Sequence, residues 1–248
     1  MTTNRPDPAE KKSDVTVVIL AKDEGGTIGD VVRGCLAFTP HVLVADGASA
    51  DDTASNAKAA GAEVIEDGGG GKGKGIRAAI PHVHTGIAVF IDADGSHSPD
   101  DIPSLTAPIR RGVADYVIGS RLFGGSSELH GGFDEFFRLA GGAFITACIN
   151  WRFKVRLSDS QNGYRAIRTE ALRHLDLKED STTIEQEMTI KALRLGYRVV
   201  DVPSHEHRRK FGKSHINVAK AAFRYLFSMV KYLLTMLLVM RFSPLAVL

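Results

Sequence analysis

The sequence predicts an α/β protein built on a doubly wound, mostly parallel β-sheet. Apolar, β-branched runs at residues 15–20 and 42–45 are typical of strands that are buried on both faces, as in a parallel sheet. A helical pattern follows each of these runs, and strands that alternate with helices form parallel sheets through right-handed crossovers. A chain of 248 residues is long enough for one such core and an appendage.

The N-terminal half supplies the expected elements in order. Residues 1–13 are polar and include prolines, so we expect a disordered lead-in. After the first strand, Thr27 stands at a helix N-cap position, and apolar residues at helical spacing follow it. The second helix opens at Asp52 or Thr53. A short apolar run at 89–91 marks the end of a further buried strand.

The composition argues against two classes of protein. The formal net charge is +2, so the chain lacks the overall basic character that suits nucleic acid, and we expect no nucleic-acid partner. The two cysteines, Cys35 and Cys148, are far apart and lack metal-ligand spacing. They indicate a reducing compartment and argue against a disulfide framework.

Two aspartates follow the strand that ends at residue 91. Residues two apart in an extended backbone point the same way, so Asp92 and Asp94 are expected together at the C-terminal edge of the sheet, where open α/β sheets bind ligands. Adjacent carboxylates repel each other, and a bound Mg²⁺ or Mn²⁺ ion commonly neutralises this repulsion. Such an ion usually also binds substrate phosphates. The alternative is a solvated Asp-Gly turn between a strand and a helix.

Asp46 ends the second strand at the same edge. An acidic residue at a strand end can hold a base or a ribose hydroxyl. The alternative is a helix-capping turn, because Asp-Gly-x-Ser also forms turns.

The segment 68–82 is rich in glycine and carries Lys72, Lys74 and Arg77. Such a loop can bring backbone N–H groups and a lysine onto phosphates, although it lacks the spacing of a P-loop. The alternative is a flexible linker.

Seven motifs in the chain occur in the order typical of one known family: VVILAKDEGGTIGDVV, VADGASADDT, GKGKGIRAAI, FIDADGSHSPDDI, VIGSR, DSQNGYRAI and EQEMTIKALRLGYRVVDVPSHEHRRKFGKSH. Over residues ~14–215 the chain resembles family 2 glycosyltransferases, in particular the dolichol-phosphate mannosyltransferase-like branch. The resemblance implies the nucleotide-diphospho-sugar transferase (GT-A) fold. It also implies metal-dependent, inverting transfer of a sugar from a GDP- or UDP-sugar to a polyprenyl phosphate, of the dolichyl or undecaprenyl type.

The resemblance also implies roles for individual residues. Those expected to bind the nucleotide sugar are Glu24, Asp46, Lys74, Asp92 and Ser214. Those expected to hold the metal, Mg²⁺ or Mn²⁺, are Asp92, Asp94 and Ser96. Those expected to receive the acceptor phosphate are Arg121, Arg138 and Arg209, and the catalytic set is Asp92, Asp94 and Arg209. Asp159 and Glu187 are expected either to contact the sugar or to lie behind the residues that contact the substrates.

The chemistry of the acceptor leaves alternatives open. A phosphate monoester is already anionic at pH 7 and needs little help from a general base, whereas a sugar hydroxyl would need one. Asp180, in the acidic segment 177–187, is a candidate for that base. A glycosyltransferase with a saccharide or small-molecule acceptor is therefore an alternative, and so is a catalytically inactive nucleotide-sugar-binding protein.

The C-terminal tail predicts a membrane-surface element. In residues ~217–241 the polar side chains fall on one narrow arc of a helix and a wide arc is apolar, with Lys220, Arg224 and Lys231 in the polar arc. Lys231 near the centre disfavours a spanning helix, so we expect a basic amphipathic helix in the headgroup plane. The expected organisation is a lead-in (1–13), a glycosyltransferase domain (14–215) and an interfacial tail (216–248) at the cytoplasmic face of the membrane. The alternative is a tail packed on the domain of a cytoplasmic enzyme.

Overall fold

The computed structural model describes residues 14–127, 133–209 and 223–233. Its centre is a seven-stranded sheet in the order β3-β2-β1-β4-β6-β5-β7. The strands are β1 (Val15–Ala21), β2 (His41–Asp46), β3 (Glu63–Glu66), β4 (Ile87–Asp92), β5 (Tyr116–Ser120), β6 (Arg165–Arg168) and β7 (Val199–Pro203). Among the strands of the described chain, β6 alone runs against its neighbours, β4 and β5. The predicted mostly parallel sheet is confirmed.

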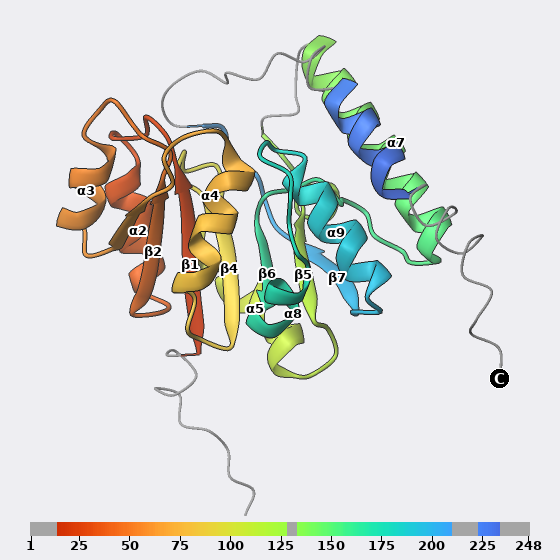
Figure 1. The fold of residues 1–248 in the computed structure, drawn as a ribbon, viewed down its shortest axis with the longest axis horizontal. Coiled ribbons are helices and arrows are strands. Elements are labelled where there is room, and N and C mark those ends of the chain that lie inside the picture. Colours follow the sequence, from red (N-terminus) through yellow and green to blue (C-terminus); the bar gives the residue numbers. More distant parts are fainter. Residues whose placement is uncertain (1–13, 128–132, 210–222, 234–248) are drawn as a thin grey trace, which may run out of the picture.

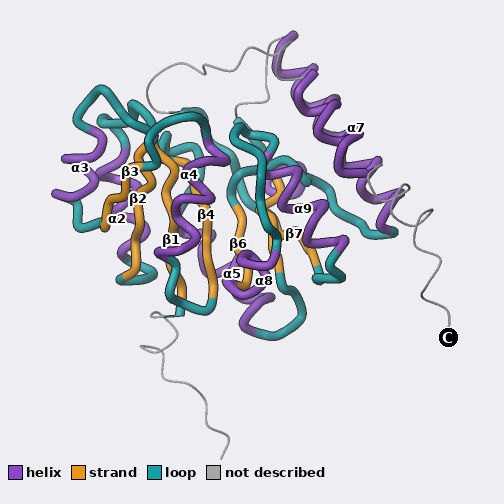
Figure 2. Tube along the Cα trace, viewed as in Figure 1, coloured by secondary structure: helices purple, strands orange, loops and turns teal. Residues whose placement is uncertain are grey.

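Helices cover both faces of this sheet (Figures 1 and 2). One face packs against α2 (Ile28–Leu36), α3 (Thr53–Ala59) and α5 (Ile102–Arg110). The other packs against α4 (Lys72–Ala79), α7 (Phe133–Phe153), α8 (Thr169–His174) and α9 (Ile184–Arg194). Short elements complete the chain: η1 (Ile80–His82), η2 (Pro99–Asp101) and α6 (Arg121–Gly124).

Strand β1 shows why its sequence lacks a polar face. Val17 and Ile19 point into the core cluster beneath α2 and α5, whereas Val18 points into the cluster beneath α4 and α9. Alternate side chains of a strand face opposite sides of the sheet, so a strand with helices on both sides is apolar on both faces. Thr16 is the one polar side chain of β1, and its hydroxyl bonds to that of Thr85.

The direction of chain winding reverses beside β1. The chain moves from β1 to β2 and β3 on one side and then returns to place β4 on the other side. Ala21 is paired in register with Asp46, and Leu20 with Asp92, so the two aspartates reach the same edge of the sheet, as predicted. Open α/β sheets bind ligands at such a reversal point.

A helix over residues 223–233 packs beside α7 (Figure 1). Its Met229 and Tyr232 join a core cluster that also contains Ile145 and Ile149 of α7. This part of the tail therefore packs on the body of the protein. Within the described residues, no helix combines the length and the apolar run that crossing a membrane requires.

Asp115 lies at the end of the sheet opposite the carboxyl edge and bonds to residues at the ends of three strands. It precedes β5, and its partners are Arg168 at the end of β6 and Arg198 just before β7. Its carboxylate accepts hydrogen bonds from the backbone N–H and the guanidinium of Arg198, each at 2.9 Å, and from Nε of Arg168 at 3.1 Å. These bonds, led by that of the Arg198 side chain, lower the pKa of Asp115 to about 2.

We expect Asp115→Asn to lower the free energy of unfolding by about 1–2 kcal/mol at pH 7, the range for hydrogen bonds to a charged group with some solvent screening. The folded pKa of about 2 lies below the ordinary value of ~3.9, so the stabilisation is present above that value and is lost as the pH falls towards 2. Urea unfolding at pH 7 and near pH 2.5 tests this. The surface variant Asp30→Asn is the control, and a difference that does not shrink with falling pH would contradict the assignment.

Candidate active site

The carboxyl edge of the sheet carries an ion-pair cluster around Asp92 and Asp94. β4 ends at Asp92, and Asp94 lies in a turn in which Gly95 has φ +74°. The two residues therefore do not share the extended backbone that the sequence suggested, but both line one cavity. Oδ1 of Asp94 accepts hydrogen bonds from the N–H of Ser96 (2.9 Å) and from its hydroxyl (2.6 Å), so in this structure Ser96 supports Asp94.

Lys72, the first residue of α4, joins two carboxylates. Its ammonium lies 2.6 Å from Oδ1 of Asp92 and 2.7 Å from Oε1 of Glu185. Burial alone would lower the pKa of Lys72, but the two carboxylates outweigh burial and raise this pKa above its ordinary value. For Asp92, burial alone would raise the pKa of the carboxyl group. Lys72 and His97 outweigh burial, so the pKa of Asp92 is lowered. Lys72 and Asp92 therefore both carry charge at neutral pH.

Arg209, which follows β7 in the chain, makes the second bridge. Its guanidinium lies 2.9 Å from Oε1 of Glu24 and 2.9 Å from Oδ2 of Asp94. Glu24 follows β1, so this arginine joins the ends of β1 and β4. Burial raises the pKa of Glu24 although Arg209 opposes that shift.

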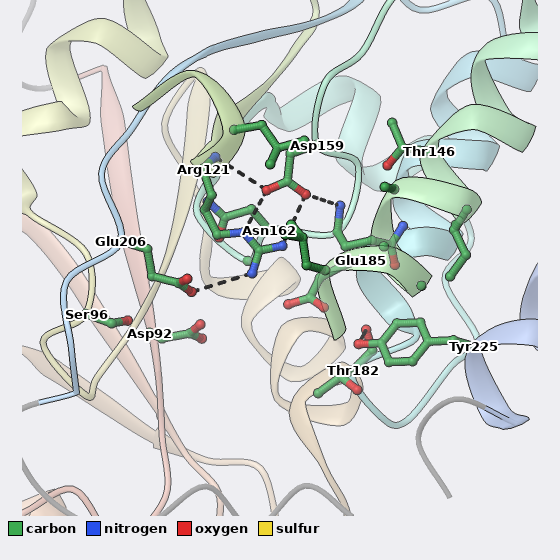
Figure 3. A pocket seen from close by; sticks show the side chains of 18 of the residues that line it. Asp92, Ser96, Arg121, Thr146, Asp159, Asn162, Thr182, Glu185, Glu206 and Tyr225 are labelled. Carbon is green, nitrogen blue, oxygen red and sulfur yellow. Dashed lines mark hydrogen bonds and ion pairs between the residues drawn. The ribbon is translucent and has the colours of Figure 1, made fainter. Parts of the chain in front are cut away.

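A third cluster surrounds Arg121, the first residue of α6 (Figure 3). Its Nε donates to Asp159 at 2.6 Å, and its Nη1 lies 3.5 Å from Oε1 of Glu206. Ser126 donates to the other oxygen of Glu206 at 2.7 Å. Burial raises the pKa of Asp159, but Arg121 outweighs it and the pKa is lowered. Arg121 is thus held by two acidic neighbours.

These clusters line one cavity of about 320 Å³ (Figure 3). Its charged lining consists of the acidic residues Asp92, Asp94, Asp159, Glu185 and Glu206 and the basic residues Lys72, Arg121 and Arg209. The rest of the wall includes apolar residues of α6, α7 and the 223–233 helix: Leu122, Leu139, Ala143, Phe144, Ile145 and Leu226. Acidic residues outnumber basic ones, so the cavity suits a cation together with an anionic ligand.

The donor set fits Mg²⁺ or Mn²⁺ bound jointly with a substrate. In the part of the chain that the structure describes, no group of three or more His, Cys, Asp or Glu residues forms a complete metal cage. Mg²⁺ is usually held by only one or two carboxylates, with substrate phosphates and water as further ligands. Asp92 and Asp94 match that requirement.

Several predicted residues lie away from this cavity. The side chain of Lys74 lies beneath the glycine-rich loop, where a Cβ on Gly68 would be 3.5 Å from its Nζ. Asp46 accepts hydrogen bonds from the N–H and the hydroxyl of Ser49, in the loop before α3. Asp180 pairs with Arg77 at the surface.

Three further predicted residues, Glu187, Ser214 and Arg138, are not among the cavity-lining residues of the described chain. Glu187, on α9, is buried and accepts hydrogen bonds from the backbone N–H groups of Lys178 and Glu179. Ser214 and the side chain of Arg138 lie outside the described residues.

Three residues of the site were not predicted: Gly163, Glu185 and Glu206. A Cβ at Gly163 would lie 2.9 Å from Oδ2 of Asp92 and 3.0 Å from Oε1 of Glu185, so only glycine leaves room for the Lys72 bridge. Gly163 was part of the motif DSQNGYRAI, and its place there was the available signal. Glu185 and Glu206 lie in the motif that begins EQEMTIK, but within it their charge alone did not distinguish them from surface acids.

Comparison with known proteins identifies the family. The profile of Glycosyl transferase family 2 matches residues 16–176, which is well over half of the chain. The chain therefore belongs to glycosyltransferase family 2 and is a glycosyltransferase with the GT-A fold.

Relatives are similar over most of the chain. An undecaprenyl-phosphate mannosyltransferase of Micrococcus luteus is 32% identical over 190 residues, which is 71% of this chain and 75% of the relative. Glycosyltransferase AglJ of Haloferax volcanii is 29% identical over 201 residues, and the match covers 80% of this chain but 64% of AglJ. A crystal structure of glucosyl-3-phosphoglycerate synthase from Mycobacterium tuberculosis, in complex with Mn²⁺, UDP and glucosyl-3-phosphoglycerate, has a TM-score of 0.71 and 21% identity. That likeness covers 93% of this chain and 86% of the other, and it supports the fold.

The positions of the two lysines lead to a prediction. Lys72→Met should weaken binding of a nucleoside diphosphate with Mn²⁺ by about 10- to 100-fold, because a charged contact of about 1.5–3 kcal/mol is lost from the cavity. The matched variant Lys74→Met, two residues away and outside the cavity, should change binding less than about 2-fold. Isothermal titration calorimetry measures both, and melting curves check that each variant is folded. A larger loss of binding in Lys74→Met than in Lys72→Met would instead favour Lys74 as the lysine that binds the nucleotide, as the sequence motif suggested.

Proposed function

We propose that this glycosyltransferase moves a sugar from a nucleotide-diphosphate sugar (a GDP- or UDP-sugar) to a polyprenyl phosphate, with Mg²⁺ or Mn²⁺ and with inversion at the anomeric carbon. The observation that carries the proposal is the two-sided cavity. One side holds the charged clusters at the sheet edge, and the other is an apolar wall from α7 and the 223–233 helix. A polyprenyl phosphate has the same two parts, a charged head and an apolar chain. The undecaprenyl-phosphate mannosyltransferase also supports the proposal, and so does a second relative, a polyprenol monophosphomannose synthase of Mycolicibacterium smegmatis that is 30% identical over 144 residues.

The donor end lies around Asp92 and Asp94, the carboxylates proposed to hold the metal. A bound divalent ion stabilises the charge that develops on the leaving diphosphate. Lys72 and Arg209 are positioned to bind the oxygens of the leaving diphosphate as well, because Lys72 contacts Asp92 and Arg209 contacts Asp94. Glu24 and Asp46 end or follow the neighbouring strands, on the side proposed for the nucleoside.

The acceptor end lies around Arg121, beside the apolar wall. Arg121, Arg138 and Arg209 are proposed to receive the acceptor phosphate, and Asp159 orients Arg121 through two hydrogen bonds. A phosphate acceptor needs no general base to become anionic at neutral pH. Asp180, the base considered for a saccharide acceptor, pairs with Arg77 and does not line the cavity, which favours the lipid phosphate.

Exposed apolar residues extend this wall to the surface and support a membrane location. Phe144 and Trp151 on α7 are 57% and 74% exposed. The 223–233 helix adds Phe223, Leu226, Phe227 and Val230, which are at least 43% exposed. Arg152 lies over the ring of Phe153, and Lys154 lies over the ring of Trp151. Basic side chains beside aromatic ones suit the headgroup region. We propose that this face docks on the cytoplasmic side of a membrane.

The test is a donor screen with GDP- and UDP-sugars, a polyprenyl phosphate, and Mg²⁺ or Mn²⁺. Labelled sugar should enter the lipid phase only when the polyprenyl phosphate is present, and EDTA should stop the transfer. Asp94→Asn should lower the rate about 100-fold or more, because it removes a charge proposed to hold the metal against the leaving diphosphate.

Asp100→Asn is the matched control, since Asp100 is exposed on η2, the short helix that follows the turn of Asp94. Transfer that survives EDTA would contradict the metal assignment. Transfer to a soluble saccharide and none to the lipid would favour the saccharide-acceptor alternative.

The membrane face gives a separate prediction. Phe227→Glu and Trp151→Glu should each weaken binding to anionic vesicles about 10-fold or more, because burying such a side chain contributes about 1.5–3 kcal/mol. Co-sedimentation with vesicles measures this, and Val113→Glu, at an exposed apolar position outside this face, is the control. Unchanged sedimentation of both variants would rule out this face as the docking surface.

A further inference from the structure

The 223–233 helix holds a loop of the catalytic domain through two side chains. The hydroxyl of Tyr232 lies 2.9 Å from Oε1 of Glu179 and 2.9 Å from Oε1 of Glu187, and it can donate to either carboxylate. Lys231 pairs with the same oxygen of Glu179 at 2.7 Å. Glu187 also accepts from the N–H of Glu179 at 2.8 Å. The start of the loop 178–183 is thus held between α9 and the helix.

The other side of the same loop holds the start of α4. The carbonyl oxygen of Asp180 accepts from the N–H of Gly73 at 2.8 Å, and Arg77 donates to the carbonyl of Glu179. There is no spare room at this contact, because a Cβ on Gly71 would lie 2.5 Å from the Asp180 carbonyl oxygen. A displacement of residues 179–180 must therefore move the first turn of α4.

That first turn carries Lys72, whose ammonium joins Asp92 and Glu185. Glu185 is in the first turn of α9, directly after the same loop. Both the backbone that presents Lys72 and one of its two carboxylate partners thus depend on the position of the loop.

The phenol of Tyr232 is the hydrogen-bond donor and the carboxylate of Glu179 is the acceptor. Burial and the two carboxylates raise the pKa of Tyr232 above its ordinary value, so the phenol keeps its proton. Burial raises the pKa of Glu179, but Lys231, Thr183 and Tyr232 outweigh it, so Glu179 stays ionised. Without the hydroxyl, two neighbouring carboxylates would lose their shared donor, and the loop would lose a contact that fixes it.

We propose that Tyr232 is a positioning residue for the donor end of the cavity, acting through the loop 178–183 on Lys72. This inference rests on the proposed donor site but requires neither a lipid nor a membrane. The 223–233 helix then has two roles, since Phe223, Phe227 and Val230 are exposed while Met229 and Tyr232 pack on the catalytic domain.

The test is a double-mutant cycle on binding of a nucleoside diphosphate with Mn²⁺, measured by calorimetry on the full chain. Tyr232→Phe removes only the hydroxyl and should weaken binding about 3- to 10-fold, as expected for one hydrogen bond. In a Lys72→Met background the same change should have less than about a 2-fold effect, because its target is gone. The KM for polyprenyl phosphate should stay unchanged.

Two further variants keep the result interpretable. Tyr197→Phe, which removes a tyrosine hydroxyl that bonds to His174 elsewhere on the surface, should leave binding unchanged. If Tyr232→Phe fails to fold, Lys231→Met removes the neighbouring contact to Glu179 and should weaken binding in the same Lys72-dependent way. Unchanged binding in folded Tyr232→Phe, or equal losses with and without Lys72, would overturn the inference. Absence of binding by the wild type would instead count against the proposed donor site.

Discussion

The structure depends on neutralising the carboxylates gathered at one edge of the sheet. Parallel strands end at the same edge, so Glu24, Asp92 and Asp94 are brought together by the topology itself. Charges this close are tolerable only when opposite charges lie between them. Lys72 and Arg209 supply those charges from α4 and from the segment after β7. The cluster therefore joins parts of the chain that are distant in sequence.

The same ion pairs make the site suitable for transfer chemistry. Each cation already contacts an acidic residue, so it could exchange one oxygen partner for another on binding of the proposed metal and diphosphate. Arg121 is similarly held by Asp159 and Glu206 beside the apolar wall. The charges are thus in place before the substrate binds, which limits the reorganisation that the reaction requires.

On two helices the cavity is lined by the residue two positions before the one that the motifs singled out. On α4 the motif suggested Lys74, and the structure turns Lys72 into the cavity. On α9 Glu185 lines the cavity, and Glu187 is buried behind it, which is one of the two places expected for Glu187. Residues two apart on a helix point about 200° away from each other, so one member of each pair faces the cavity and the other faces away. The sequence shows that a helix begins near each motif, but its rotation about its own axis is set by packing. For α9 that packing includes the contact between Glu187 and Tyr232, which are 45 positions apart.

The sequence by itself determined the α/β class, the mostly parallel sheet and the positions of Asp46 and Asp92 at one edge. These features follow from local patterns, since β-branched runs form buried strands and the strand ends fix where the next residues lie. The tertiary structure alone decided which cations reach the aspartates and that Gly163 must leave room for them. It also decided that Tyr232 and Leu226, from beyond the expected domain boundary, pack into or line the catalytic domain. Those features depend on contacts between distant segments, whose geometry is set only when the helices pack on the sheet.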